Sequence, residues 1–132
     1  MKKRVDKVRR ILAAEAQLYR IEQLKMAALE RRTAELETTQ VELIAALNDS
    51  DALQGLFIDT TARRLSSISE EAERVRRDKT AQGLKLREHA TRVKVSERLF
   101  REHAKEFERE KEGKELLEVV EQFVGRKPTS LP

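Results

Sequence analysis

Apolar residues recur at alternating intervals of three and four along two stretches of the chain, residues 5–47 and 65–107. In the first stretch nine of the thirteen positions at this spacing are apolar, and in the second eight of thirteen. A repeat of this kind keeps one seam of a helix facing a partner helix. No proline interrupts either stretch, since the first one is Pro128. The pattern therefore predicts two long helices.

The predicted seam positions alternate between the two core sites of a heptad. In the first stretch they are Val5, Val8, Leu12, Glu15, Tyr19, Glu22, Met26, Leu29, Thr33, Leu36, Gln40, Leu43 and Leu47. In the second they are Leu65, Ile68, Ala72, Val75, Lys79, Gln82, Leu86, His89, Val93, Ser96, Phe100, His103 and Phe107.

Turn-forming residues separate the two stretches. Asn48, Asp49, Ser50 and Asp51 have side chains that compete for backbone hydrogen bonds, and Gly55 follows. We predict helix 1 over about 4–47, a break over about 48–61, helix 2 over about 62–124 and a frayed tail over 125–132. A capping box at Ser67 would instead make residues 52–66 a short separate helix, and continuous helix from about residue 60 is a third possibility.

Reversal of the chain at this break predicts an all-α fold, an elongated antiparallel two-helix coiled-coil hairpin with a longer C-terminal helix. In such a hairpin the numbers of facing seam residues add to a constant, here about 108 or about 115. The heptads leave these two registers open. In both, helix 2 extends past helix 1 by on the order of 10 to 17 residues, a length of roughly 15 to 25 Å.

Apolar residues are concentrated on this predicted extension, where the hairpin has no helix to cover them. They are Leu116, Leu117, Val119, Val120, Phe123 and Val124. Exposed apolar clusters of this size usually mark an interaction surface. The alternatives are that the tail folds back onto the hairpin or that two chains cover each other. Gly125 is expected to adopt the left-handed conformation just past the helix end, beside Arg126 and Lys127.

Two further groups of apolar residues lie outside the seam. Ile11, Ala14, Leu18 and Ile21 flank it on helix 1, so either the seam drifts there or this face receives another partner helix. Leu56, Phe57 and Ile58 follow one another near the break, where a tight turn would normally be polar.

Composition agrees with an elongated helical chain. Charged residues make up 39% of it and aromatic residues 4%, which suits a narrow seam rather than a wide core. Disorder is the competing interpretation, but disordered chains of this charge usually lack sustained heptads. With no cysteine, no apolar run near 18 residues and no apolar segment behind the basic start, we expect a cytoplasmic protein without disulfides.

The residue patterns of catalytic and metal sites are missing from the sequence. His89 and His103 are fourteen positions apart, about 21 Å along one helix, so they cannot share a metal ion. No glycine-rich phosphate loop occurs. We therefore expect a protein without enzymatic activity, catalytic residues, cofactor, metal ion or small-molecule substrate. Glu15 and Glu22 are acidic seam residues that could pair with His89 or with flanking basic residues and so fix the register.

A basic N-terminus raises the question of nucleic-acid binding. Six of residues 2–10 are Lys or Arg. However, Val5 and Val8 fall within the run, Asp6 interrupts it, and no base-reading set of Asn or aromatic residues is present. We do not expect nucleic-acid binding beyond non-specific contact with phosphates.

Two heptad helices, a break near the middle and a longer second helix together resemble the FliJ/YscO family, the central stalk of flagellar and related type III export ATPases. The closest local likeness is the C-terminal end, where family members have an acidic and apolar helix that closes in one or two basic residues. Here it reads Glu115-Leu116-Leu117-Glu118-Val119-Val120-Glu121-Gln122-Phe123-Val124-Gly125-Arg126-Lys127-Pro128. The chain has Leu117-Glu118 where the family commonly has an Asp-Glu pair.

The resemblance implies a non-enzymatic stalk or adaptor for bacterial flagellum biogenesis or type III secretion, a protein-transport role at the cytoplasmic face of the inner-membrane export apparatus. Its partners would be the export ATPase hexamer, an export gate protein and substrate chaperones, without membrane insertion. The residues expected to bind partners are Leu116, Leu117, Val120, Phe123, Val124, Arg126, Lys127, Leu56, Phe57, Ile11, Leu18 and Ile21, with Leu53 and Ile58 beside the break. A generic coiled-coil scaffold or homodimer is the alternative, and neither the export system nor the oligomeric state follows from the sequence.

Overall fold

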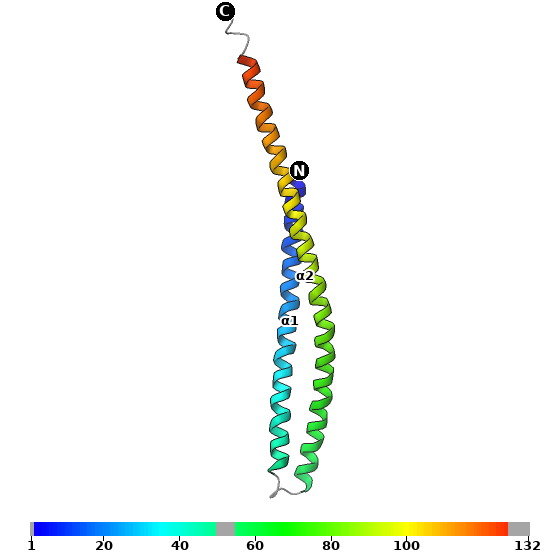
Figure 1. Ribbon diagram of the computed structural model, residues 1–132. Helices are drawn as coiled ribbons and strands as arrows, with labels where there is room; N and C mark the ends of the chain where they lie inside the picture. Colours follow the sequence, from blue (N-terminus) through cyan, green and yellow to red (C-terminus); the bar gives the residue numbers. More distant parts are fainter. Residues whose placement is uncertain (1, 50–54, 127–132) are drawn as a thin grey trace, which may run out of the picture. The chain divides into compact units, whose positions relative to one another are not determined.

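The computed structural model describes residues 2–49 and 55–126, apart from the side chains of Leu56 and Arg126, and these residues form two long helices. Helix α1 spans Lys2–Asn48 and helix α2 spans Gly55–Arg126 (Figure 1). The described residues contain no strand. The prediction of an all-helical chain with two long helices is confirmed.

The start of α2 differs from the sequence prediction. Residues 55–61 were expected in the break but are helical, and Ser67 lies inside α2 rather than at a cap. The seam also begins earlier than expected, because Thr61 is only 7% exposed. An ion pair between Asp59 and Arg63, with 3.1 Å between the side-chain oxygen and nitrogen, supports these first turns. The expected turn at residues 50–54 lies outside the described residues.

The end of α2 also differs from the prediction. Gly125 lies within the helix, and no described glycine has a positive φ. The helix therefore continues to Arg126 without the left-handed terminating residue expected at Gly125. Of residues 125–132, which were expected to fray, the first two are helical, and residues 127–132 lie outside the described part.

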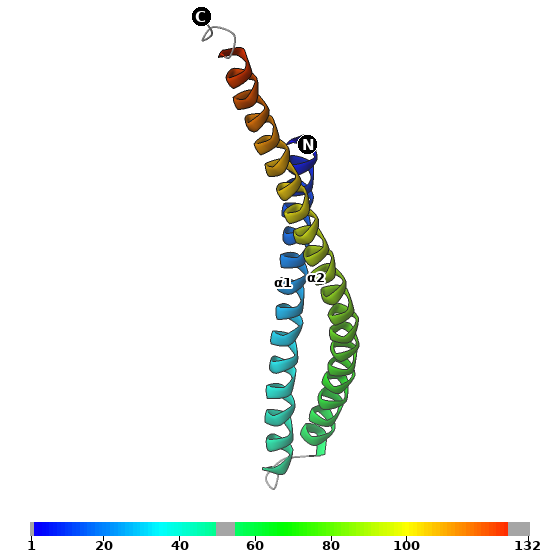
Figure 2. The ribbon, with the colours of Figure 1, turned by 45° about the horizontal axis from the view of Figure 1, so that its top comes forward.

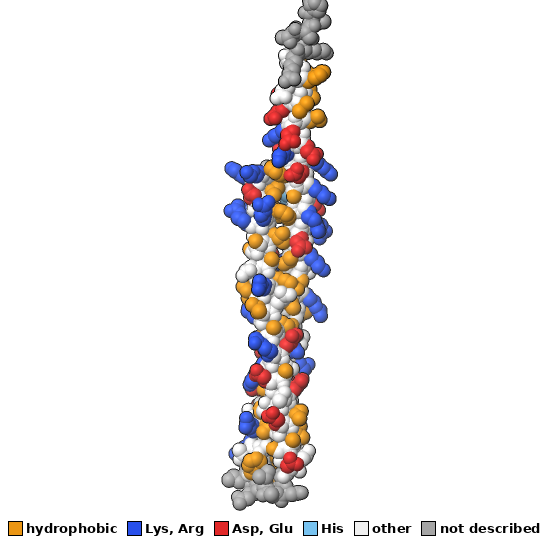
Figure 3. All heavy atoms as spheres, turned by 90° about the vertical axis from the view of Figure 1, so that its left-hand side faces the viewer, with side chains coloured by type: hydrophobic (Ala, Val, Ile, Leu, Met, Phe, Trp, Pro, Cys, Tyr) orange, Lys and Arg blue, Asp and Glu red, His pale blue; other side chains and the backbone are white. Residues whose placement is uncertain are grey.

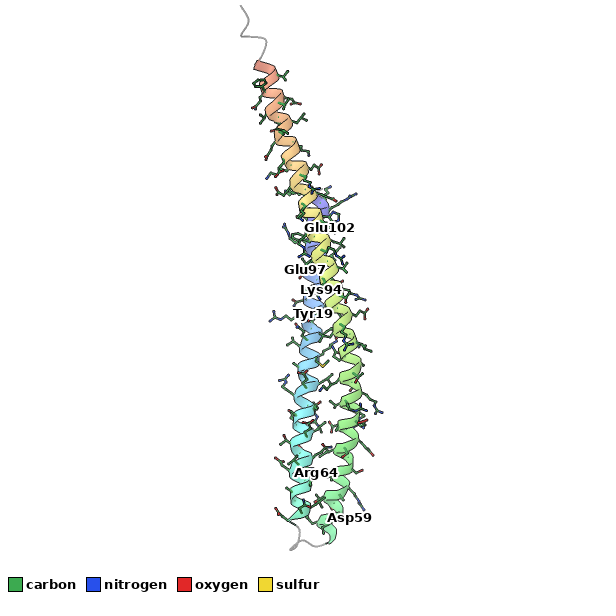
Figure 4. The ribbon with its side chains drawn as sticks, in the orientation of Figure 1. Tyr19, Asp59, Arg64, Lys94, Glu97 and Glu102 are labelled. Carbon is green, nitrogen blue, oxygen red and sulfur yellow. The ribbon has the colours of Figure 1, made fainter. Side chains whose placement is uncertain are left out.

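Two parts of the chain are described separately. The central part is Leu18–Ala90, and the terminal part combines Met1–Gln17 with Thr91–Pro132. Each part contains a stretch of α1 and a stretch of α2. Figure 4 marks Tyr19, Asp59 and Arg64 on the central part, and Lys94, Glu97 and Glu102 on the stretch of α2 in the terminal part.

In the central part, polar contacts join α1 to α2. Arg32 Nε donates to Glu71 Oε1 at 2.9 Å, and Gln40 Nε2 donates to Ser69 Oγ at 3.3 Å. Gln82 donates to the backbone oxygen of Glu22 at 3.0 Å. Partners of residues farther along α1 thus lie earlier in α2. The residue numbers add to 103, 109 and 104 in these three pairs, near the predicted value of 108 and away from 115.

In the terminal part, Arg9 lies over the ring of Phe100, with 5.7 Å between the guanidinium carbon and the ring centroid. The residue numbers of this pair add to 109, so it agrees with the same register. Figures 1 and 2 show α2 continuing past the beginning of α1 in this part. All side chains from Glu108 to Gly125 are exposed.

Burial follows the predicted seam. All thirteen predicted positions of α1 and all thirteen of α2 are buried or half-buried. The apolar residues with the least exposure are Leu36 at 2%, Val5 at 6% and Val75 at 8%. Polar Ser96 and Gln82 are buried as fully, at 6% and 7%. The core is therefore a narrow seam that contains polar layers.

The hydroxyl groups of threonines in the middle of the helices donate hydrogen bonds to backbone oxygens of the same helix. Thr33 Oγ1 donates to the backbone oxygen of Leu29 at 2.9 Å, and Thr80 Oγ1 donates to that of Arg76 at 3.2 Å. A bond to the carbonyl four residues back lets a hydroxyl sit in a helix without another partner. Thr33 can thus occupy a seam position without leaving its hydroxyl unpaired.

Candidate interaction surfaces

The C-terminal end of α2 carries the largest group of exposed apolar side chains, which we call the tail and define as residues 115–124. Their exposed fractions range from 48% for Val120 to 72% for Phe123. Glu115, Glu118 and Glu121 lie among them, and the tail contains no Lys or Arg. Its surface therefore combines apolar side chains with negative charge. The apolar members are Leu116, Leu117, Val119, Val120, Phe123 and Val124.

The two basic residues expected to act with the tail are described less fully. Arg126 is the last residue of α2, but its side chain is not described, and Lys127 lies outside the described residues. Their contribution to a partner contact therefore stays a prediction.

Next to the tail, the terminal part contains a shallow hollow that sequence reasoning missed. It consists of two adjoining depressions of about 270 Å³ and about 430 Å³ that share Lys2 and Phe107. We call their combined lining the terminal hollow. Its apolar lining comes from Val5, Phe100, Ala104 and Phe107, its basic residues are Lys2, Lys3, Arg9, Lys111 and Lys114, and its acidic residues are Asp6, Glu108 and Glu110.

The terminal hollow forms because large seam residues meet at the beginning of α1. Phe100 and Phe107 are half-buried, one heptad apart on α2. The basic side chains come from the first turns of α1 and from α2 just before the tail, and Figure 3 shows Lys and Arg side chains gathered over the beginning of α1. The sequence showed both the basic run and the two phenylalanines. Whether these residues lie close together depends on which residues of α1 face which residues of α2, and the sequence alone did not fix this.

The apolar face expected beside the seam is exposed. Ile11 in the terminal part is 45% exposed, and Leu18 and Ile21 in the central part are 44% and 41% exposed. Exposed apolar residues that the sequence analysis did not single out occur in both parts. They are Leu24, Val41, Ile44 and Leu84 in the central part and Val95 and Leu99 in the terminal part.

Near the start of α2, Phe57 and Ile58 are 46% and 39% exposed. The side chain of Leu56 is not described, and Leu53 lies outside the described residues. The helical start of α2 thus presents two apolar side chains, although the expected contact surface there was larger.

A polar layer crosses the seam of the central part. Gln82 Nε2 donates both to the backbone oxygen of Glu22 and to its carboxylate, and Lys25 Nζ donates to the other carboxylate oxygen at 3.3 Å. These bonds, the one from Gln82 first, hold the pKa of Glu22 below its usual value, with a smaller contribution from the charges of Lys25 and His89. The expected pairing of Glu22 with a basic neighbour is thus observed, while its main partner, Gln82, was not anticipated.

Three other polar seam residues have a buried side-chain atom without such a bond. One carboxylate oxygen of Glu15 and the Nδ1 atoms of His89 and His103 are buried without a hydrogen-bond partner. His103 Nδ1 lies 3.7 Å from a carboxylate oxygen of Glu106, within ion-pair distance. The predicted role of Glu15 in pairing is therefore not seen in the described contacts.

Another hollow, in the central part, has several of its polar side chains engaged in bonds within their own helices. It is an open depression of about 570 Å³, lined by residues of both α1 and α2. The hydroxyls of Thr33 and Thr80 donate to their own helices, and Glu73 pairs with Arg76 at 2.5 Å. The bonds from Arg76 lower the pKa of Glu73, which keeps this carboxylate ionised and poor as a base.

Nowhere in residues 2–49 and 55–126 do three or more His, Cys, Asp or Glu side chains gather closely enough to hold a metal ion. Neither described helix contains a segment long and apolar enough to cross a membrane.

Comparison with known proteins gave no further assignment. No family model matches the chain, and no curated protein or solved structure shows significant similarity to it.

Proposed function

We propose that the two helices form an antiparallel coiled-coil hairpin. The cross-helix pairs of the central part support this arrangement, because partners of later residues in α1 lie earlier in α2. Burial of every predicted heptad position supports it as well. The proposed register is the one in which facing residue numbers add to about 108.

We propose further that this hairpin is a non-enzymatic stalk or adaptor of a bacterial flagellar or type III protein export apparatus. The observation that carries the proposal is the tail. It is an uncovered helical segment with six exposed apolar side chains at the end of α2. A stalk that enters a ring-shaped ATPase needs a projecting helix of this kind, whose apolar surface can be covered by the ring.

In this proposal the tail contacts the export ATPase hexamer. Burial of even a third of its apolar surface would contribute several kcal/mol at roughly 25 cal/mol per Å², before the cost of association. Arg126 and Lys127 are proposed to act beside it. The apolar residues near the start of α2, Leu56 and Phe57, are proposed to meet the export gate protein or substrate chaperones.

The decisive experiment measures ATP hydrolysis by an export ATPase with and without this chain. The full chain should stimulate hydrolysis, and the double variant Leu116→Ser/Phe123→Ser should lose most of that stimulation. Both replaced side chains are highly exposed, at 66% and 72%, so circular dichroism should stay helical. Truncation after Glu112, which removes the whole tail, should have the same effect.

Leu24→Ser is the matched control for this experiment. Leu24 is 64% exposed but lies in the central part, so its replacement should preserve stimulation. Full stimulation by the truncated chain would rule out the tail as the ring contact. The face of Ile11, Leu18 and Ile21 would then be the proposed ring contact.

A generic coiled-coil scaffold or homodimer is the second candidate. The observation in its favour is the number of exposed apolar side chains along both helices, which another helical chain could cover. A chain of this kind would not stimulate an export ATPase, so the same assay separates the two proposals.

A further inference from the structure

The tail and the terminal hollow are complementary surfaces of the same part of the chain. The tail has three carboxylates and no basic residue. The terminal hollow has five basic and three acidic residues around an apolar lining. An acidic helix with apolar side chains therefore matches the hollow in both charge and polarity.

A chain cannot place its tail in its own hollow. Helix α2 is continuous from Gly55 to Arg126, so residues 115–124 continue along its axis past the beginning of α1 (Figure 2). Reaching back would require a sharp reversal within residues 112–118, which are helical. A second chain has no such restriction.

We propose that a second copy of this chain seats its tail in the terminal hollow, so that two copies exchange tails about a two-fold axis. In such a dimer the α2 helices of the two copies pack antiparallel. The tail is centred near residue 120 and the hollow near residue 106, which places the axis close to Gly113. Each tail then lies over the hollow of the other copy.

Gly113 suits this position. A Cβ atom added to it would meet nothing within 4 Å, so no contact inside the chain explains a glycine there. A glycine makes an exposed helix less stable than alanine would at the same position. At a two-fold crossing, two glycines face each other and let the helices approach closely.

The extent of the contact is enough for a dimer of moderate affinity. Twelve residues line the hollow and ten form the tail, so each copy contributes about 20 residues. Standard interfaces use roughly 20 to 30 residues a side. The number of residues in this contact is at the lower limit of that range, and we expect a dissociation constant in the micromolar range. The inference does not depend on the proposed export function, because it requires only this chain.

Sedimentation velocity of the purified full chain tests the proposal directly. The mass should rise from monomer to dimer as the concentration increases to on the order of 100 μM, and added salt should oppose dimer formation. A chain that stays monomeric throughout this range would overturn the proposal.

Charge reversal tests which surfaces meet. Reversal of the tail with Glu115→Lys, Glu118→Lys and Glu121→Lys should raise the dissociation constant at least about tenfold. Reversal of the hollow with Lys111→Glu and Lys114→Glu should also weaken the dimer. The five changes together in one chain should restore association, because each copy then offers a basic tail to an acidic hollow. Failure of this restoration would contradict the exchange.

Crosslinking tests the geometry, because the natural chain has no cysteine. An equal mixture of a Val119→Cys variant and a Glu108→Cys variant should form the mixed disulfide dimer under mild oxidation. Val119→Cys alone should form little, since tails of like charge lie apart in the exchanged dimer. Efficient crosslinking of Val119→Cys with itself would show that tails pair with each other, and would refute the proposal.

Discussion

Replacement of Leu36 by alanine should destabilise the chain more than any comparable change on the surface of α1. The side chain of Leu36 is 2% exposed, the smallest exposed fraction among the buried apolar residues. Leu→Ala removes three carbon groups, worth about 2.4 kcal/mol at roughly 0.8 kcal/mol each. A cavity contributes further in a closed core, but a narrow seam can close partly, so we expect a loss of about 2 to 3 kcal/mol.

Leu24→Ala is the matched control, because it is the same substitution in the same helix and the same part of the chain. Leu24 is 64% exposed, so only about a third of its surface leaves water on folding. The expected loss is below about 1 kcal/mol. The small gain in helix propensity from alanine is common to both variants and cancels in the comparison.

Urea unfolding followed by circular dichroism measures both variants. With a slope of about 2 kcal/mol per molar urea, Leu36→Ala should lower the midpoint by about 1 M and Leu24→Ala by less than half as much. Equal shifts would mean that Leu24 is covered in solution. The seam would then not be the main source of stability.

The remaining predictions concern a polar layer, a glycine and the start of α2. The hydrogen bond from Gln82 lowers the pKa of Glu22, so the stability that the ionised Glu22 supplies is present at neutral pH and is lost as the pH falls below the usual carboxylate range. Gln82→Leu should therefore reduce the decline in melting temperature at acid pH. A Cβ at residue 83 would lie 3.7 Å from the Met26 methyl group, an ordinary contact, so Gly83→Ala should stabilise the helix by about 1 kcal/mol in thermal unfolding. Phe57 is 46% exposed, so Phe57→Ser should change the melting temperature little while weakening binding to a gate protein or chaperone in a pull-down assay; a drop of many degrees would identify it as a core residue.

The sequence by itself determined which residues face the seam. Heptad spacing predicted twenty-six positions, and each is buried or half-buried, polar ones such as Gln82 and Ser96 included. Periodicity is a local property, because every third or fourth side chain lies on the same side of a helix whatever its partner is. The sequence also identified the uncovered apolar residues of the tail, because the second heptad helix is predicted to be longer than the first.

The helix ends were less predictable, because they depend on weaker local signals. Thr61 was expected in the break, but its side chain is buried. This burial favours a helical conformation there, although turn-forming residues precede it in the sequence. Gly125 could end a helix or continue it, and nothing nearby in the sequence decides between the two. The helix continues through it to Arg126.

Only the tertiary structure shows which residues of α1 and α2 contact each other and which surfaces these contacts create. A heptad pattern shifted by seven residues still matches itself, so the repeat allows facing residue numbers to add to 108 or to 115. Contacts between residues distant in the chain support the smaller value, since the residue numbers add to 109 for Arg9 over Phe100 and to 104 for Gln82 with Glu22. The terminal hollow exists because this register brings basic side chains of α1 beside Phe107, a proximity that local periodicity does not encode.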